Sequence, residues 1–202
     1  MCSLHHRRSP INLFGWLRVR TSNVYQMDLP QGVRLTPLRM HRDERGWVTE
    51  IFRDEWSVGV APCQWNATMS QANVLRGVHV HHRHHDYLVL VRGRASVGLY
   101  DARPKSPTYR RSAMIELRGD DMSGIRVPVG VMHGFYFHEP SMHIYGVDSY
   151  FDPDDELGCH WADPGLGIAW PCRDPVLSER DQHAGTLAEV EARLRSYNAE
   201  FA

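Results

Sequence analysis

The chain has 202 residues and a formal net charge of −1 at pH 7, so its length suits one well-buried domain. The balanced charge and the absence of any apolar run near the roughly 18 residues of a membrane helix argue against nucleic acid and membranes as partners. Four cysteines without C-x-x-C spacing indicate reduced thiols and a cytoplasmic protein: Cys2, Cys63, Cys159 and Cys172.

Residues 1–26 combine clustered basic side chains with a short apolar patch. The patch is too short and interrupted for a secretion signal, and the pattern predicts a flexible extension outside the domain. Met27 begins a segment that resembles a domain start and is an alternative first residue. We therefore expect an N-terminal extension at 1–26, a domain at 27–183 and a helical segment at 184–202.

Many short segments rich in β-branched and aromatic residues follow, separated by turn residues. They predict strands at 33–38, 47–52, 64–70, 87–91, 95–100, 113–117, 124–127, 134–138 and 143–147, with a polar turn at 41–46. A helix is expected at Leu187–Tyr197, where apolar residues recur at helical spacing and Thr186 can cap the first turn. This pattern is typical of a sandwich or barrel.

Histidines are concentrated in one stretch: five of the thirteen lie between His79 and His85. On a strand alternate side chains share a face, so His79 and His81 should point one way and Val78 and Val80 the other. Two imidazoles with the carboxylate of Asp86 suit a divalent transition metal. The alternative interpretation is a solvated histidine-rich loop, above all for His82, His84 and His85.

The same stretch resembles the first motif of the cupin superfamily. The matching residues are Gly77, His79, His81, Asp86, where glutamate is usual, and Gly93. Pro128, Gly130 and His133 match the second cupin motif. The resemblance implies an all-β double-stranded β-helix, or jelly roll, with a short C-terminal helix.

Further motifs, in order along residues 27–181, resemble the dTDP-4-dehydrorhamnose 3,5-epimerase family. They include Asp43-Glu44-Arg45-Gly46, Leu75-Arg76-Gly77-Val78-His79, Glu156-x-Gly158 and Leu177-Ser178-x-x-Asp181. The resemblance implies an isomerase that epimerises a nucleotide-linked 4-keto-6-deoxyhexose at C3, C5 or both, by removing a proton alpha to the ketone. It also implies a homodimer and no required cofactor.

The resemblance assigns roles to individual residues. His79 would be the base, Asp181 would fix its tautomer, and Tyr145 would be the acid. Arg45 and Arg76 fall at diphosphate-binding positions. The remaining substrate-binding candidates are Glu50, Gln64, Asn66, His133, Phe151, Glu156 and Arg180.

Two departures from the family pattern change the charge of the expected site. His81 replaces a glutamine, and Asp86 replaces a lysine that helps to steady the enolate, whereas a carboxylate would repel it. A divalent metal on His79, His81, Asp86 and His133 could act as a Lewis acid instead. A metal-bound His79 could not also be a free base, so a metal-dependent cupin isomerase or oxygenase and a non-catalytic sugar-nucleotide-binding cupin remain alternatives.

Overall fold

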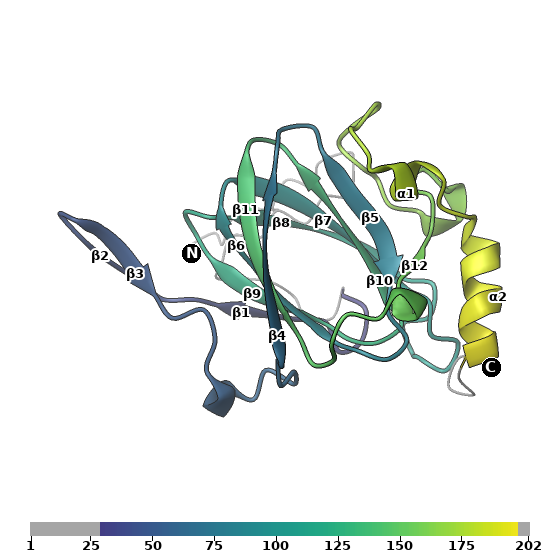
Figure 1. The fold of residues 1–202 in the computed structure, drawn as a ribbon, viewed down its shortest axis with the longest axis horizontal. Helices are drawn as coiled ribbons and strands as arrows, with labels where there is room; N and C mark the ends of the chain where they lie inside the picture. Colours follow the sequence, from purple (N-terminus) through teal and green to yellow (C-terminus); the bar gives the residue numbers. More distant parts are fainter. Residues whose placement is uncertain (1–28, 198–202) are drawn as a thin grey trace, which may run out of the picture.

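The computed structural model describes residues 29–197, so the expected extension and its alternative start at Met27 lie outside the described residues. Two five-stranded sheets face each other and enclose the interior of a barrel (Figure 1). The first sheet contains β1 (Arg34–Pro37), β9 (Ser123–Val127), β6 (Asp86–Arg92), β11 (Ser141–Val147) and β4 (Gln64–Ser70). The second contains β12 (Leu157–Gly158), β5 (Leu75–Val80), β10 (Val131–Phe137), β7 (Arg94–Asp101) and β8 (Ser112–Arg118). Each neighbouring pair is antiparallel, and the predicted jelly roll is confirmed.

The alternation of side chains along the strands explains why two sheets pack in this way. Apolar residues of both sheets meet inside the barrel, among them Val97 and Leu99 of β7, Ile125 of β9 and Phe137 of β10. All four are buried. This apolar layer fills part of the interior and leaves the remainder to polar side chains.

The segment before β4 differs from the prediction. Residues 40–43 form a strand where a polar turn was expected, and the predicted strand at 47–52 ends at Thr49. β2 (Met40–Asp43) and β3 (Gly46–Thr49) pair as a hairpin that extends away from the barrel (Figure 1). After it, residues 51–60, including a 3₁₀ turn at Asp54–Trp56, cover the outer face of the first sheet.

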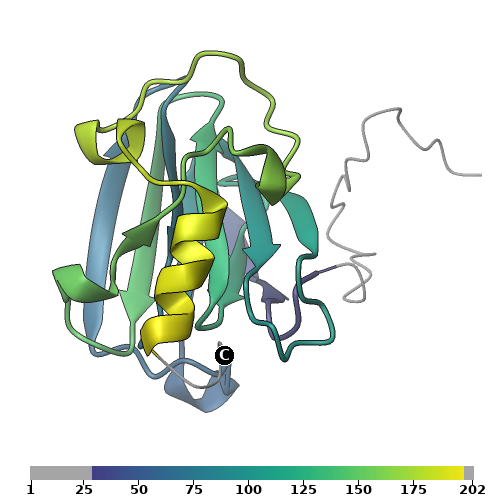
Figure 2. The same ribbon diagram turned by 90° about the vertical axis from the view of Figure 1, so that its right-hand side faces the viewer.

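The C-terminal helix α2 (Leu187–Tyr197) lies against the outer face of the second sheet (Figure 2). Thr186 caps it as expected: its Oγ accepts from the Glu189 amide at 3.3 Å, and the Glu189 carboxylate accepts from the Thr186 amide at 2.7 Å. Leu187, Val190 and Leu194 pack in one cluster with strand residues of β5, β7 and β10.

Short helical turns complete the chain: α1 (Glu179–Gln182) and 3₁₀ turns at Pro153–Asp155 and Pro164–Leu166. Within residues 29–197 there is no helix of the length and apolar character that crossing a bilayer requires.

The packing of α2 predicts that Leu194→Ala destabilises the whole domain. Leu194 is 1% exposed, and truncating such a side chain typically costs about 2–5 kcal/mol. Ser196→Ala, on the exposed side of the same helix, should change stability by less than about 0.5 kcal/mol. Urea unfolding of both variants measures the difference, and equal midpoints would show that α2 contributes nothing to the core.

Candidate functional site

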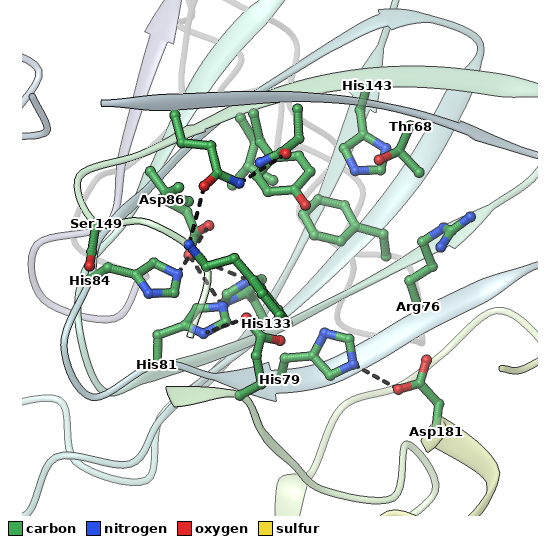
Figure 3. A pocket seen from close by; sticks show the side chains of 18 of the residues that line it. Thr68, Arg76, His79, His81, His84, Asp86, His133, His143, Ser149 and Asp181 are labelled. Carbon is green, nitrogen blue, oxygen red and sulfur yellow. Dashed lines mark hydrogen bonds and ion pairs between the residues drawn. The ribbon is translucent and has the colours of Figure 1, made fainter. Parts of the chain in front are cut away.

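A cavity of about 430 Å³ opens between the two sheets, within the size range of small-molecule sites. Strands of both sheets line it, together with the loop after β11 and the α1 turn (Figure 3). Its polar lining residues are Gln64, Asn66, Thr68, Arg76, His79, His81, His84, Asp86, His133, His143, Tyr145, Ser149, Glu156, Ser178, Arg180 and Asp181.

Strand β5 directs its histidine into this cavity. Val78 and Val80 pack beneath α2 on the outer side, whereas His79 and His81 both line the cavity, as strand alternation predicts. Gly77 makes the close approach of β5 to β10 possible, because a Cβ there would lie 2.7 Å from the Gly134 Cα. Its φ of +119° also favours glycine.

His79 is held by two neighbours from the α1 turn. Its Nε2 lies 2.7 Å from the Asp181 carboxylate, and the Arg180 guanidinium lies against the same ring, with Nη2 2.7 Å from Nε2 and 3.4 Å from Nδ1. Burial alone would raise the pKa of Asp181, but the hydrogen bond and charge of His79, together with hydrogen bonds involving Ser178 and the Gly77 amide, hold that pKa below its ordinary value. An ionised Asp181 that accepts from Nε2–H leaves Nδ1 as the basic nitrogen of His79.

Tyr145 enters the cavity from the other sheet. It lies on β11, which belongs to the first sheet, whereas His79 lies on β5 in the second. Burial raises the pKa of the Tyr145 phenol, and the nearby Asp86 raises it further. A neutral phenol on one wall and an imidazole–carboxylate pair on the facing wall can exchange protons with the two faces of a molecule between them.

The connection from β5 to β6 is folded around the carboxylate of Asp155. Its Oδ1 accepts from the backbone amides of His82 at 2.6 Å and Arg83 at 3.0 Å, and its Oδ2 lies 2.6 Å from His84 Nδ1. His82 and His84 are 8% and 6% exposed, so the alternative of a solvated loop is wrong for both. His85 pairs with Asp148 at 3.0 Å.

Asp86 is buried beside three further histidines of the cavity, His81, His84 and His133 (Figure 3). The Nε2 atoms of His81, His133 and His84 lie 3.6, 3.7 and 4.0 Å from its carboxylate oxygens. Burial raises the pKa of Asp86 to about 7, and His84 partly offsets this effect. Burial also lowers the pKa of His133 to about 3.

Most of the residues expected from the sequence meet in this cavity. His79, Tyr145 and Asp181 lie there, as do seven of the predicted substrate-binding residues: Gln64, Asn66, Arg76, His133, Phe151, Glu156 and Arg180. Arg45 and Glu50 do not line it. Arg45 pairs with Asp43 at the tip of the β2–β3 hairpin, and Glu50 pairs with Arg53 beyond it.

His84 and His143, which line the cavity, and Asp155, which contacts His84, were not among the sequence candidates. His84 belonged to the histidine tract, but its burial depends on Asp155, 71 positions away. Asp155 itself directly precedes a family motif and carried no separate signal. His143 lies in a predicted strand, and nothing in its local pattern distinguishes it from other strand histidines.

Comparison with known proteins connects this geometry to a family. Residues 27–189 match the model of the family described as dTDP-4-dehydrorhamnose 3,5-epimerase. A protein of that name from Streptomyces griseus is 33% identical over 175 residues, which cover 81% of this chain and 86% of the relative. A dTDP-4-dehydro-6-deoxyglucose 3-epimerase from Streptomyces bikiniensis is 31% identical over 162 residues, which cover 75% of this chain and 83% of the relative.

Solved structures of epimerases have a similar fold. An epimerase from Mycobacterium tuberculosis superposes with a TM-score of 0.75 at 29% identity, covering 80% of this chain and 87% of the other. A dTDP-6-deoxy-D-glucose-3,5-epimerase from Legionella pneumophila, in complex with dTDP-4-keto-L-rhamnose, has a TM-score of 0.73 at 27% identity, with coverage of 84% and 92%.

The environment of His143 predicts how acid weakens the fold. The ring lies between Phe135 and Tyr145, with centroids 5.4 and 5.8 Å away. Its Nδ1 has no hydrogen-bond partner among residues 29–197, and burial, with Arg76 nearby, lowers its pKa to about 4. Between pH 6.5 and 4 the unfolded chain therefore binds a proton that the folded chain does not, so stability falls as the pH falls.

We expect the wild type to lose about 2 kcal/mol more stability than His143→Gln between pH 7 and pH 5. Chemical denaturation at the two pH values measures this, and the comparison of slopes cancels any constant cost of the substitution. Parallel losses in the two proteins would mean that the pKa of His143 is the same in the folded and the unfolded chain.

Proposed function

The chain belongs to the dTDP-4-dehydrorhamnose 3,5-epimerase family, and we propose that it epimerises a nucleotide-linked 4-keto-6-deoxyhexose at C3, C5 or both. The observation that carries the proposal is the placement of His79, paired with Asp181, and Tyr145 on facing sheets of one cavity. Epimerisation requires removal of a proton from one face of a carbon and its return to the other.

In the proposed reaction His79 removes the proton alpha to the ketone. The C–H electron pair moves into a carbon–carbon double bond, and the carbonyl pair moves onto the ketone oxygen, which gives an enolate. Asp181 stabilises the imidazolium that forms, because it accepts the Nε2 proton at 2.7 Å in a largely water-excluded position. Arg180, against the same ring, limits how far the base can rotate.

Tyr145 then donates its phenolic proton to the same carbon from the opposite face, and the enolate returns to the ketone. Burial and the nearby Asp86 keep this phenol protonated at neutral pH by raising its pKa. The configuration at the carbon is inverted because donor and base stand on different sheets. Solvent exchange restores both groups.

The rest of the cavity suits the nucleoside diphosphate. Arg76 and Arg180 are guanidinium groups at its wall, suited to phosphate oxygens. Gln64 and Asn66 lie side by side with their side chains 3.1 Å apart, and Phe151 stands at the rim with 66% of its surface exposed. An exposed ring beside polar amides is available to stack on a sugar or a base.

We propose that the enzyme is a homodimer in which each hairpin completes the partner's site. Arg45 is 83% exposed at the hairpin tip and lies outside the cavity of its own chain. Trp47 and Val48 expose 46% and 66% of their surface on the same projecting hairpin. Burying these side chains against a second copy would shield apolar surface and deliver Arg45 and Glu50 to a neighbouring cavity.

A cytoplasmic location forms part of the same proposal. Cys63, Cys159 and Cys172 are free thiols in the described part of the chain. Free thiols suit a reducing compartment.

Solvent exchange separates the two proton-transfer roles. In deuterium oxide we expect His79→Asn to lower deuterium incorporation into a dTDP-4-keto-6-deoxyhexose by about 100-fold or more. Tyr145→Phe keeps the base, so it should retain incorporation while the inverted product falls by a similar factor. Mass spectrometry and NMR of the sugar measure both quantities. Absence of exchange in the wild type, with normal dTDP binding, would favour the non-catalytic alternative.

The hairpin exchange predicts complementation between two inactive variants. Arg45→Ala and His79→Asn should each be inactive as homodimers, but a hybrid contains one site with both groups intact. Random mixing should restore about one quarter of wild-type activity. If Arg45 acts within its own chain, co-expression will restore nothing. Light scattering on the same samples checks that dimers form.

A further inference from the structure

Three imidazoles converge on one buried carboxylate at distances too long for hydrogen bonds. The Nε2 atoms of His81 and His133 lie 3.6 and 3.7 Å from the same oxygen of Asp86, and His84 Nε2 lies 4.0 Å from the other. All four side chains are buried, and all four line the cavity (Figure 3).

The other nitrogen of each ring faces an acceptor, which fixes its tautomer. His81 Nδ1 faces the Asp155 carbonyl at 3.3 Å, His133 Nδ1 faces the Val131 carbonyl at 3.3 Å, and His84 Nδ1 faces the Asp155 carboxylate at 2.6 Å. A ring that donates from Nδ1 presents the lone pair of Nε2. Three lone pairs and a carboxylate therefore point into one space, and an outer acceptor orients each ring, as around bound metals.

The spacing fits a shared ion. Ligand bonds of about 2.1 Å in a tetrahedral arrangement place donor atoms about 3.4 Å apart. The separations from Asp86 to His81 and His133 are close to this value, and the donor atoms of these three residues all lie within 4.8 Å of one another.

We propose that His81, Asp86 and His133 bind one divalent transition-metal cation, with the remaining coordination positions open to the cavity. His84 acts on the second oxygen of Asp86 as a positioning residue. His79, which the sequence suggested as a further ligand, instead turns its Nε2 to Asp181. This arrangement removes the conflict between ligand and base, because separate histidines perform the two roles.

The proposed role of the cation rests on the proposed function. An enolate formed beside His79 would be repelled by a bare Asp86 carboxylate in a buried site. His81, Asp86 and His133 would hold a divalent cation that offsets the charge of the Asp86 carboxylate and would supply a Lewis acid for the ketone oxygen. Base and acid lie on facing sheets, and the cation would be held between them by His133 of one sheet and Asp86 of the other.

Zinc titration of untagged protein, first stripped with a chelator, tests the site. We expect one tight Zn²⁺ site in the wild type, and an affinity lower by more than about 100-fold in Asp86→Asn and His133→Gln. His84→Gln, which alters only a positioning residue, should weaken binding by about 10-fold. His143→Gln changes a buried histidine of the same cavity outside the cluster and should bind as the wild type does.

Equal Zn²⁺ affinity in the wild type, Asp86→Asn and His133→Gln would overturn the site and assign binding to other histidines. Circular dichroism confirms that each variant is folded. Deuterium exchange with and without Zn²⁺ or Mn²⁺ tests the role: faster exchange with metal supports it, and an unchanged rate overturns it. Specific metal binding with no exchange in any sample would instead overturn the proposed function and leave the site intact.

Discussion

The geometry of the site depends on how the chain crosses from one sheet to the other between β5 and β6. The crossing occupies only residues 81–85, and the buried carboxylate of Asp155 holds it through two backbone amides and the ring of His84. A buried carboxylate is stable only where such donors satisfy it, so the loop and Asp155 require each other. This contact fixes the end of β5 relative to the start of β6.

That crossing places two chemically different groups in one cavity. On one side, His79 contacts Asp181 and Arg180 of the α1 turn. On the other side, the Nε2 atoms of His81, His84 and His133 face the carboxylate of Asp86. Adjacent histidines therefore serve different partners, because strand direction and loop geometry turn their rings to different carboxylates. The histidine-rich tract is thus divided between the contact with Asp181 and the surroundings of the buried Asp86.

The features that match the epimerase family and the residues that depart from its pattern lie in the same two sheets. The paired sheets, the His79–Asp181 contact and Tyr145 agree with the match to the epimerase family over residues 27–189. Asp86, at the start of β6, makes the cavity floor acidic, and burial raises its pKa to about 7. The β2–β3 hairpin projects from the barrel (Figure 1), and Arg45 at its tip does not line the cavity of its own chain.

Local patterns in the sequence determined most of the strands, because alternation of apolar residues is a property of neighbouring positions. They also determined that Val78 and Val80 face away from His79, and that Leu187–Tyr197 is a capped helix. The polar residues at 41–46 predicted a turn, but residues 40–43 form a strand because they pair with Gly46–Thr49. The resemblance of the motifs to the family identified His79, Tyr145 and Asp181 as candidate site residues, but it did not show how their side chains are arranged.

Only the tertiary structure decided which ring nitrogen faces which carboxylate. Asp181 lies 102 positions from His79 and Asp155 lies 71 positions from His84, so no local pattern could separate His79 from the cluster around Asp86. The same holds for the burial of His84, which its sequence surroundings made resemble a solvated loop residue. Side-chain orientation at such positions is set by long-range packing and desolvation, which act only after both sheets have closed around the cavity.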